Sequence, residues 1–354
     1  MTIPATPPGR GQEPHLDELA AADGENWRRY AGGAGAVWRV LTGAAGRGEG
    51  VHTIAAAMSG HLLAVMLAGA AMFLMVNVLA VAVLLGAVVL GVATNLRSVR
   101  YAATQLLRGR ERHDGTPATA TLRVCSWNLL NTNTAENTAQ AVSAANAQVV
   151  VLFETEQRHL DVVQELSPGT KWRELASYAG DGRIQHDGIA AYCSHPEASA
   201  EIVMLAGMRA VRIETELDGE KLAIWGFRPE APIGRSRRAR WSQQLAALHD
   251  ALRAEPLEYV LVGDLNSCIY HLPLLTILDA EQLDSAVPIW RGTWRHPHLG
   301  WRARIDHALI TTGLVAQGSV VKEPYGSDHR MLCAEISRRK VGEQSGKRTS
   351  PTSL

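Results

Sequence analysis

The longest apolar stretch of the chain lies in its N-terminal third. No Asp, Glu, Lys or Arg occurs between Glu49 and Arg97, and residues 62–92 are almost wholly Ala, Val, Leu, Met and Gly. One transmembrane helix requires ~20 consecutive apolar residues, and this stretch exceeds that length. The pattern therefore predicts a transmembrane segment over residues 51–96, which lies too far along the chain to be a cleaved signal peptide.

The number of membrane spans stays open. A single helix over residues 60–93 would be about 50 Å long, whereas the hydrocarbon core of a bilayer is ~30 Å thick. A hairpin of two short spans over residues 51–94 fits this thickness better, although Asn77 is its only turn signal. Arginines flank both sides, so the positive-inside rule favours a hairpin with the rest of the chain in the cytoplasm. A single span with the N-terminus inside would instead place the rest of the chain outside.

From residue 121 onward the pattern changes to short apolar runs separated by turns and amphipathic stretches. Such mixed strands and helices predict one α/β domain with two packed sheets or layers. The predicted strands are Leu122–Trp127, Val149–Phe153, Gly188–Cys193, Ala200–Met204, Ala210–Glu214, Lys221–Phe227, Tyr259–Val262, His307–Ile310 and Met331–Ile336. The predicted helices are Thr134–Asn146, Gln157–Leu166, Arg237–Arg253 and His271–Leu278.

The chain thus divides into five segments. A disordered and interfacial helical segment (1–50) precedes the transmembrane segment (51–96) and a basic linker (97–119). The α/β domain occupies residues 120–337, and a polar, disordered tail (338–354) ends the chain.

Charge and cysteine content narrow the class of protein. The chain has 35 Lys and Arg residues and 35 Asp and Glu residues, so its formal net charge is zero. This balance argues against a protein built around non-specific nucleic-acid binding, which requires a basic face.

The four cysteines are far apart, and no pair has CxxC spacing. We therefore expect buried, reduced thiols rather than a disulfide framework, which favours a reducing compartment.

Polar residues follow the predicted strands at the points where these strands end. These strand ends carry Ser126–Asn128, Glu154, Gly263–Asn266, Ile305–His307 and Ser327–His329. Binding and catalytic residues of α/β proteins are commonly built at such positions. We therefore expect these side chains to form one site.

The chemistry of these residues suits a hard divalent cation. Mg²⁺ prefers oxygen ligands and keeps several waters, so few protein ligands suffice. A bound Mg²⁺ can polarise a phosphoryl oxygen, while His329 or Asp264 handles protons. The chain has no HExxH motif and no Cys/His cluster, so a zinc site is not predicted. The candidate oxygen ligands are Glu154, Asp328, Asn128 and Asn266.

Six short motifs follow one another along the chain: RVCSWN (123–128), VVVLFE (149–154), GIAAYCSHP (188–196), GDLN (263–266), RIDH (304–307) and GSDH (326–329). In this order they resemble the endonuclease/exonuclease/phosphatase superfamily. This superfamily includes DNase I-like nucleases, abasic-site endonucleases, sphingomyelinases and inositol-phosphate phosphatases. The resemblance covers residues 120–337 and is closest to the bacterial membrane-anchored branch, in which apolar spans precede the domain.

The resemblance implies a four-layer α/β/β/α sandwich (DNase I-like) that hydrolyses phosphoesters with Mg²⁺ or Mn²⁺. It implies that Asp264 and Asn266 orient or activate the attacking water. It also implies that Asp306 holds His329 in the useful tautomer and that His329 contacts the phosphate. The implied metal ligands are Glu154, Asp328 and Asn128, and the implied substrate contacts are Asn128, Asn266 and Arg228.

Arg228 departs from the family pattern. Most hydrolases of this class carry a His after the strand that here ends at Gly226, whereas this chain has Arg228. A guanidinium can hold a phosphate bidentately, but at pH 7 it cannot act as a general acid. Arg228 therefore either binds the substrate phosphate in the catalytic site or marks a catalytically weakened relative.

Three functions follow from these observations. The leading hypothesis is a membrane-anchored, metal-dependent phosphoesterase that hydrolyses a phosphate ester or diphosphate, with lipid-linked substrates within reach of the bilayer. A nuclease uses the same catalytic parts, but nucleic acid is the less favoured partner for a chain of zero net charge. The third is a membrane-tethered binding protein that has lost turnover. No obligate protein partner is predicted.

Overall fold

The computed structural model describes eight stretches of the chain. They are residues 65–70, 78–111, 120–130, 133–165, 172–180, 187–296, 300–323 and 326–339. The predicted N-terminal segment (1–50), the first part of the predicted transmembrane segment and most of the predicted tail lie outside the described residues.

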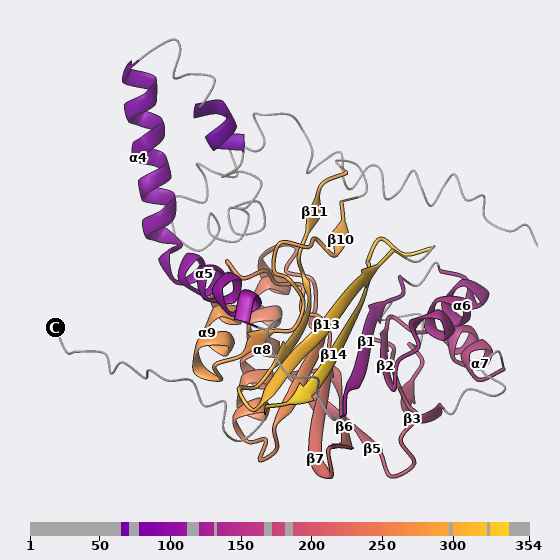
Figure 1. The fold of residues 1–354 in the computed structure, drawn as a ribbon. Coiled ribbons are helices and arrows are strands. Elements are labelled where there is room, and N and C mark those ends of the chain that lie inside the picture. Colours follow the sequence, from indigo (N-terminus) through magenta and orange to yellow (C-terminus); the bar gives the residue numbers. More distant parts are fainter. Residues whose placement is uncertain are drawn as a thin grey trace, which may run out of the picture. The chain divides into compact units, whose positions relative to one another are not determined.

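Two six-stranded mixed sheets form the domain (Figure 1). The strand order of the first sheet is β13 (Leu314–Lys322), β14 (Met331–Arg338), β1 (Leu122–Asn128), β2 (Val149–Phe153), β4 (Ile189–Cys193) and β3 (Arg173–Tyr178). The order of the second is β5 (Ser199–Leu205), β6 (Met208–Leu217), β7 (Glu220–Phe227), β8 (Tyr259–Asp264), β12 (Asp306–Ile310) and β9 (Asp284–Ser285). The pairs β1–β2 and β7–β8 are parallel, and their neighbours are antiparallel.

The alternation of side chains along each strand explains how the layers pack. In β1, Val124 lies in the core between the sheets, whereas Cys125 and Trp127 point to the other face, because successive strand residues face opposite sides. Helices α6 (Ala135–Ala145) and α7 (Gln157–Glu165) pack on that outer face of the first sheet. Helices α8 (Arg235–Arg253) and α9 (Leu272–Ala280) cover the outer face of the second sheet. The described layers are therefore helix, sheet, sheet, helix, as predicted.

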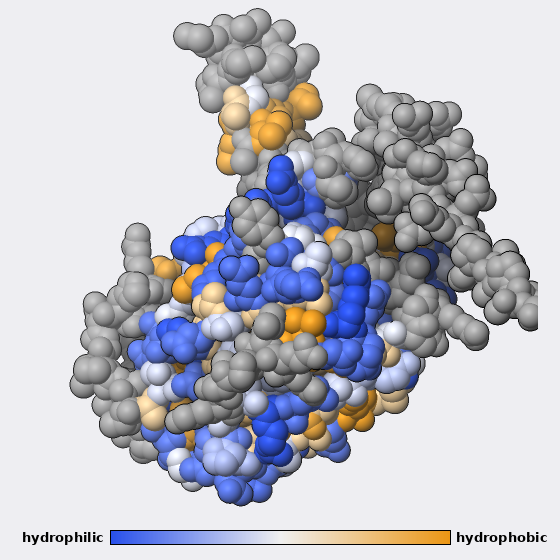
Figure 2. All heavy atoms as spheres, turned by 90° about the vertical axis from the view of Figure 1, so that its right-hand side faces the viewer, coloured by the Kyte–Doolittle hydropathy of each residue, from blue (hydrophilic) through white to orange (hydrophobic). Residues whose placement is uncertain are grey.

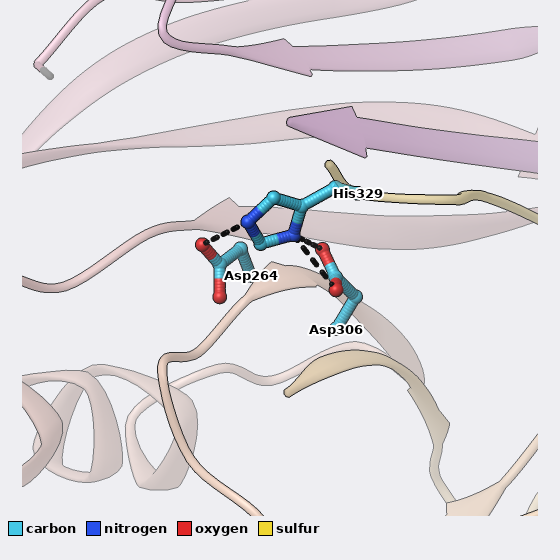
Figure 3. Close-up of side chains that lie close together, drawn as sticks. All are labelled: Asp264, Asp306 and His329. Carbon is cyan, nitrogen blue, oxygen red and sulfur yellow. Dashed lines mark hydrogen bonds and ion pairs between the residues drawn. The ribbon is translucent and has the colours of Figure 1, made fainter. Parts of the chain in front are cut away.

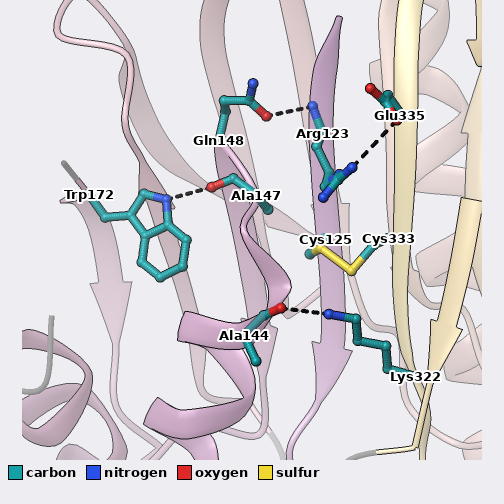
Figure 4. Close-up of a disulfide and its surroundings, with 9 residues drawn as sticks. All are labelled: Arg123, Cys125, Ala144, Ala147, Gln148, Trp172, Lys322, Cys333 and Glu335. Carbon is teal, nitrogen blue, oxygen red and sulfur yellow. Dashed lines mark hydrogen bonds and ion pairs between the residues drawn. A yellow bond between two sulfur atoms is a disulfide. The ribbon is translucent and has the colours of Figure 1, made fainter. Parts of the chain in front are cut away.

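A disulfide joins two neighbouring strands of the first sheet (Figure 4). Cys125 of β1 and Cys333 of β14 are direct partners in the antiparallel register, with their Cα atoms 4.1 Å apart. The prediction of four reduced thiols is wrong for this pair, because the strand register brings together residues that are 208 positions apart in the sequence. Cys193 and Cys268 are free and buried, as predicted.

The apolar segment ends in a helix whose surface is exposed. Helix α4 (Val78–Thr94) carries no charged residue, and Val83, Val89 and Leu90 are each about two-thirds exposed. Figure 2 shows a hydrophobic surface near the upper end of the view. Within the described stretches, no single helix is long and apolar enough to cross a bilayer, although the bent pair Val83–Thr94 and Leu96–Leu107 meets both criteria jointly.

The predicted linker begins as a helix that packs on the domain. Helix α5 (Leu96–Glu111) follows α4 after a sharp bend (Figure 1). The Tyr101 hydroxyl donates to Leu283 O at 3.2 Å, and Gln105 Nε2 donates to Asp284 Oδ1 at 2.9 Å. The Ser285 N–H in turn donates to Gln105 Oε1 at 3.0 Å. These contacts tie α5 to β9, at the edge of the second sheet.

Candidate active site

One end of the two sheets carries the predicted site residues. Asn128 ends β1, and Glu154 follows β2, which lies parallel to β1. In the second sheet, Asp264 ends β8 and is the direct antiparallel partner of Asp306, the first residue of β12. The register of the strands thus gathers four separate sequence motifs at one place.

Asp306, His329 and Asp264 form a buried row (Figure 3). His329 Nδ1 lies 3.0 Å from both carboxylate oxygens of Asp306, and Nε2 lies 3.8 Å from Asp264 Oδ2. Burial alone would lower the pKa of His329, but the charges of Asp306 and Asp264 overcome this and raise the pKa to about 10. The imidazole is therefore protonated, with one nitrogen facing each carboxylate.

The backbone of His329 is fixed from the first sheet. Its N–H donates to Ser327 Oγ at 3.0 Å, and Ser327 Oγ donates to Asn128 O at 2.8 Å. The indole of Trp127 donates to His329 O at 3.2 Å. The loop before β14 is thus attached to the end of β1, which carries Asn128.

The Asp264 carboxylate is held by two donors. Its Oδ1 accepts from the Asn266 N–H at 2.9 Å, and its Oδ2 accepts from Asn128 Nδ2 at 3.1 Å. Burial raises the pKa of Asp264 to about 6, and the charge of Asp306 adds to this, while His329 and Arg228 act in the opposite direction. The preceding Gly263 is required, because a Cβ there would lie 2.1 Å from the carbonyl oxygen of Phe227.

Glu154 lies beside this row, and Arg228 is its ion-pair partner. Glu154 Oε1 accepts from Asn128 Nδ2 at 2.9 Å and pairs with Arg228 Nη2. The Arg228 Nε is 3.6 Å from Asp264 Oδ2. Asn128 therefore bridges Glu154 and Asp264, and Arg228 lies against the same two carboxylates. The structure thus brings Arg228 together with Glu154 and Asp264, and its catalytic or substrate-binding role stays a prediction.

Asp328 is held by a residue that the sequence did not single out. Its Oδ2 accepts from the indole N–H of Trp294 at 2.7 Å. Trp294 belongs to β10 (Trp294–Arg295), which pairs with β11 (Arg302–Ala303) in a short ribbon. A bridge between Trp294 and His329 brings this ribbon to the site. Trp294 lies outside all six motif segments of the sequence.

The side chain of Asn266, a predicted site residue, forms a hydrogen bond to the backbone of a neighbouring loop. Its Nδ2 donates to the carbonyl oxygen of Pro229 at 3.0 Å, and its φ is +47°. The side chain therefore ties the loop after β8 to the loop after β7. A direct role of this amide toward water or substrate stays a prediction.

The donor set of the site fits a divalent cation. Four carboxylates, those of Glu154, Asp264, Asp306 and Asp328, face two cationic groups, Arg228 and His329. Asp328 Oδ1 is buried without a hydrogen-bond partner, 4.0 Å from His329 Nε2. An acidic site with such an oxygen suits a hard cation that prefers oxygen ligands.

The contacts of His329 narrow the position of such a cation. Ligand atoms of Asp264, Asp306 and His329 lie within 4.8 Å of one another, which is close enough to share an ion. Both ring nitrogens of His329, however, already face carboxylates, Nδ1 that of Asp306 and Nε2 that of Asp264. Glu154 and Asp328 are therefore the better candidates.

Comparisons with known proteins identify a family and a fold. A sequence model described as the Endonuclease/Exonuclease/phosphatase family matches residues 125–329. The structure of TDP2 from D. rerio complexed with single strand DNA product aligns with 62% of this chain and 99% of its own, at 14% identity and a TM-score of 0.51. An endonuclease/exonuclease/phosphatase from Beutenbergia cavernae DSM 12333 aligns with 62% of this chain and 72% of its own, at 18% identity and a TM-score of 0.50. Comparison with curated protein sequences finds no match. At identities of 14% and 18%, these two structures show that this chain has the same fold as they have.

Proposed function

The chain belongs to the endonuclease/exonuclease/phosphatase family, and we propose that it is a divalent-metal-dependent phosphoesterase. Members of this family are hydrolases that act on phosphate esters, and they generally depend on a metal ion. The observation that carries the proposal is the buried row of Asp306, His329 and Asp264, joined to Glu154 through Asn128.

Mg²⁺ or Mn²⁺ would be held by oxygens of Glu154 and Asp328, with Asn128 beside them. When bound, such an ion polarises a phosphoryl oxygen and offsets the charge on the leaving group. This assignment is supported by the surplus of carboxylates and by the unpartnered Asp328 Oδ1.

Two residues have proposed roles in moving or stabilising charge. Asp264 accepts the proton of the attacking water, because its carboxylate is buried and fixed by donors on both oxygens. His329 directs Nε2–H at a phosphoryl oxygen, where charge develops during attack. Asp306 holds the imidazole charged and in one orientation through Nδ1.

We further propose that the domain acts at a membrane. The apolar stretch before residue 97 contains no ionised side chain after Glu49, and its described end, α4, exposes large apolar side chains. An apolar surface of this kind commonly marks a membrane or protein contact. Lipid phosphate esters or diphosphates are then substrates within reach of the site.

A nuclease is the second candidate. The D. rerio TDP2 structure, which shares the fold, was determined with a single strand DNA product. The zero net charge of this chain counts against nucleic acid, which attracts basic surfaces.

The test is a cleavage panel on the purified full-length chain in detergent. The substrates are bis(p-nitrophenyl) phosphate, a lipid diphosphate and plasmid DNA, each with Mg²⁺, Mn²⁺ or EDTA. We expect cleavage with either ion, none with EDTA, and faster turnover of the lipid diphosphate than of DNA. Faster cleavage of DNA would instead favour the nuclease.

Matched variants show whether the activity belongs to this site. Glu154→Gln should abolish cleavage, whereas Glu156→Gln, two residues away in an ion pair with Arg158 near the surface, should not. Cleavage that survives both EDTA and Glu154→Gln would contradict the proposed metal site. A chain that binds these phosphates but cleaves none would be the binding relative.

A further inference from the structure

Arg228 lies between two carboxylates of the site. It follows directly after β7, and only 10% of its side chain is exposed. Its Nη2 pairs with Glu154 Oε1, and its Nε lies 3.6 Å from Asp264 Oδ2. A guanidinium stays charged at every pH at which the protein is folded. Arg228 is therefore a permanent cation beside the proposed metal ligand.

Arg228 shares its carboxylate partners with Asn128. Asn128 Nδ2 donates to Glu154 Oε1 at 2.9 Å and to Asp264 Oδ2 at 3.1 Å, the same two oxygens that Arg228 approaches. A divalent cation at Glu154 would meet the guanidinium at that carboxylate. Two cations a few ångströms apart repel strongly in a buried site, where the effective dielectric is low.

We propose that Arg228 is an internal counterion of Glu154, which competes with the divalent cation for this carboxylate and transfers to the substrate phosphate when both bind. This inference rests on the proposed function, because it assumes a metal at Glu154 and a phosphate beside it. The guanidinium fork suits two phosphate oxygens as well as a carboxylate. Phosphate thus draws Arg228 from Glu154, and the metal gains the carboxylate.

The consequence is positive coupling between metal and phosphate. A phosphate that releases Glu154 strengthens metal binding, and by linkage the metal strengthens phosphate binding by the same factor. Metal alone binds weakly, because it must displace Arg228. Arg228, in the place of the family's usual His, would then make metal binding depend on phosphate binding, in addition to contacting the phosphate.

The experiment measures Mn²⁺ binding to the full-length chain in detergent by titration calorimetry at pH 8. Phenylphosphonate, a phosphate-ester analogue with an uncleavable C–P bond, is either absent or saturating. We expect the analogue to tighten Mn²⁺ binding of the wild type by roughly 5- to 100-fold. Arg228→Gln should bind Mn²⁺ tightly without the analogue and should show little further gain with it.

Matched variants show whether a change in Mn²⁺ affinity comes from the charge at position 228 or from the loss of any arginine. Arg240→Gln removes an arginine from another Arg–Glu pair, with Glu230 at 2.8 Å, at a half-exposed position outside the site. It should behave as the wild type. Arg228→Met, which carries no charge at any pH, is a second variant and should bind Mn²⁺ as Arg228→Gln does. Arg228→Lys retains the charge and should stay weak.

The outcomes distinguish this inference from the proposed function. If Arg228→Gln and Arg228→Met bind Mn²⁺ no more tightly than the wild type, or if the analogue leaves wild-type binding unchanged, the inference is overturned while the metal site stands. If no variant binds Mn²⁺, or if Glu154→Gln binds it as the wild type does, the proposed metal site itself fails.

Discussion

Glu154 holds a backbone conformation that residues with a Cβ rarely adopt. Its φ is +57°, and a left-handed backbone costs a non-glycine residue roughly 1–2 kcal/mol. Its side chain is buried and bonded to Asn128 and Arg228. Glycine would relieve the backbone but would supply no carboxylate, so the chain accepts local strain to place this group.

We expect Glu154→Ala to destabilise the domain as well as to remove a proposed metal ligand. It leaves the guanidinium of Arg228 buried without its carboxylate partner, and breaking one side of a buried ion pair costs about 3–5 kcal/mol. Glu154→Gln retains an acceptor oxygen and should cost less. Urea unfolding measures both, with Glu156→Ala as the control near the surface. An unchanged unfolding midpoint for Glu154→Ala would show that the pair contributes nothing to stability.

Asp306 and His329 should behave as one unit in catalysis. Each single variant, Asp306→Asn or His329→Gln, should lower kcat/KM by about 10²–10⁴-fold, because the charged and oriented imidazole is lost in either case. The double variant should lose little more than the worse single variant. Losses that multiply in the double variant would mean that the two residues act independently, against the 3.0 Å contact between them.

The sequence identified most of these side chains but not their partners. Asn128, Glu154 and Asp264 were predictable because each lies at or directly after the end of a buried strand. The hydrogen bond from Trp294 to Asp328 joins residues 34 positions apart and accompanies the bridge between Trp294 and His329, which no local pattern encodes. The pairing of Arg228 with Glu154 depends likewise on how the two sheets face each other.

Among the elements, the inner strands of both sheets were predicted, whereas of the four edge strands only β5 was predicted and β3, β13 and β9 were missed. Strands such as β2 and β4 are buried throughout, and their apolar runs are visible in the sequence. By contrast, β3 and β13 form the two edges of the first sheet and are mostly half-exposed, so their sequences mix polar and apolar residues. Edge strands therefore give a weaker signal than central ones.

Helix α5 was missed for a related reason. Its charged residues are typical of a linker, yet Ser98 and Gln105 are buried against the domain. The face of α5 that contacts the domain carries polar side chains, so it is not recognisable as a buried face from the sequence. Their hydrogen-bond partners at β9 are not apparent from the sequence either. The helix is thus part of the domain, and it contacts the strand that pairs with β12, which carries Asp306.

We expect Gln105→Ala to lower the free energy of unfolding by about 2 kcal/mol. The substitution removes two buried hydrogen bonds, one donated to Asp284 and one accepted from Ser285, and each contributes roughly 0.5–1.5 kcal/mol, or more where the acceptor is charged. Thr104→Ala, on the exposed side of the same helix, is the control. Equal urea midpoints for the two variants would show that α5 is a linker after all.

At the scale of the whole molecule, two indicators of its compartment disagree. The five arginines between Arg97 and Arg112 favour a cytoplasmic domain by the positive-inside rule. The disulfide between Cys125 and Cys333 favours an oxidising compartment outside the cytoplasm. Arg97 forms an ion pair with Asp279 of the domain at 2.6 Å, so its charge is partly neutralised and counts less in the positive-inside rule. We therefore give the disulfide more weight and predict a domain outside the cytoplasm, where a single span with the N-terminus inside would place it.

Labelling in intact cells tests this prediction. The full-length chain should fractionate with membranes, and a Ser345→Cys variant should react with an impermeant thiol reagent. The wild type is the matched control, because Cys193 and Cys268 are buried and Cys125 is bonded to Cys333. Denatured but unreduced wild type should titrate as two thiols. Four thiols, together with labelling only after lysis, would place the domain in the cytoplasm, because only a reducing compartment would keep both facing cysteines of β1 and β14 as thiols.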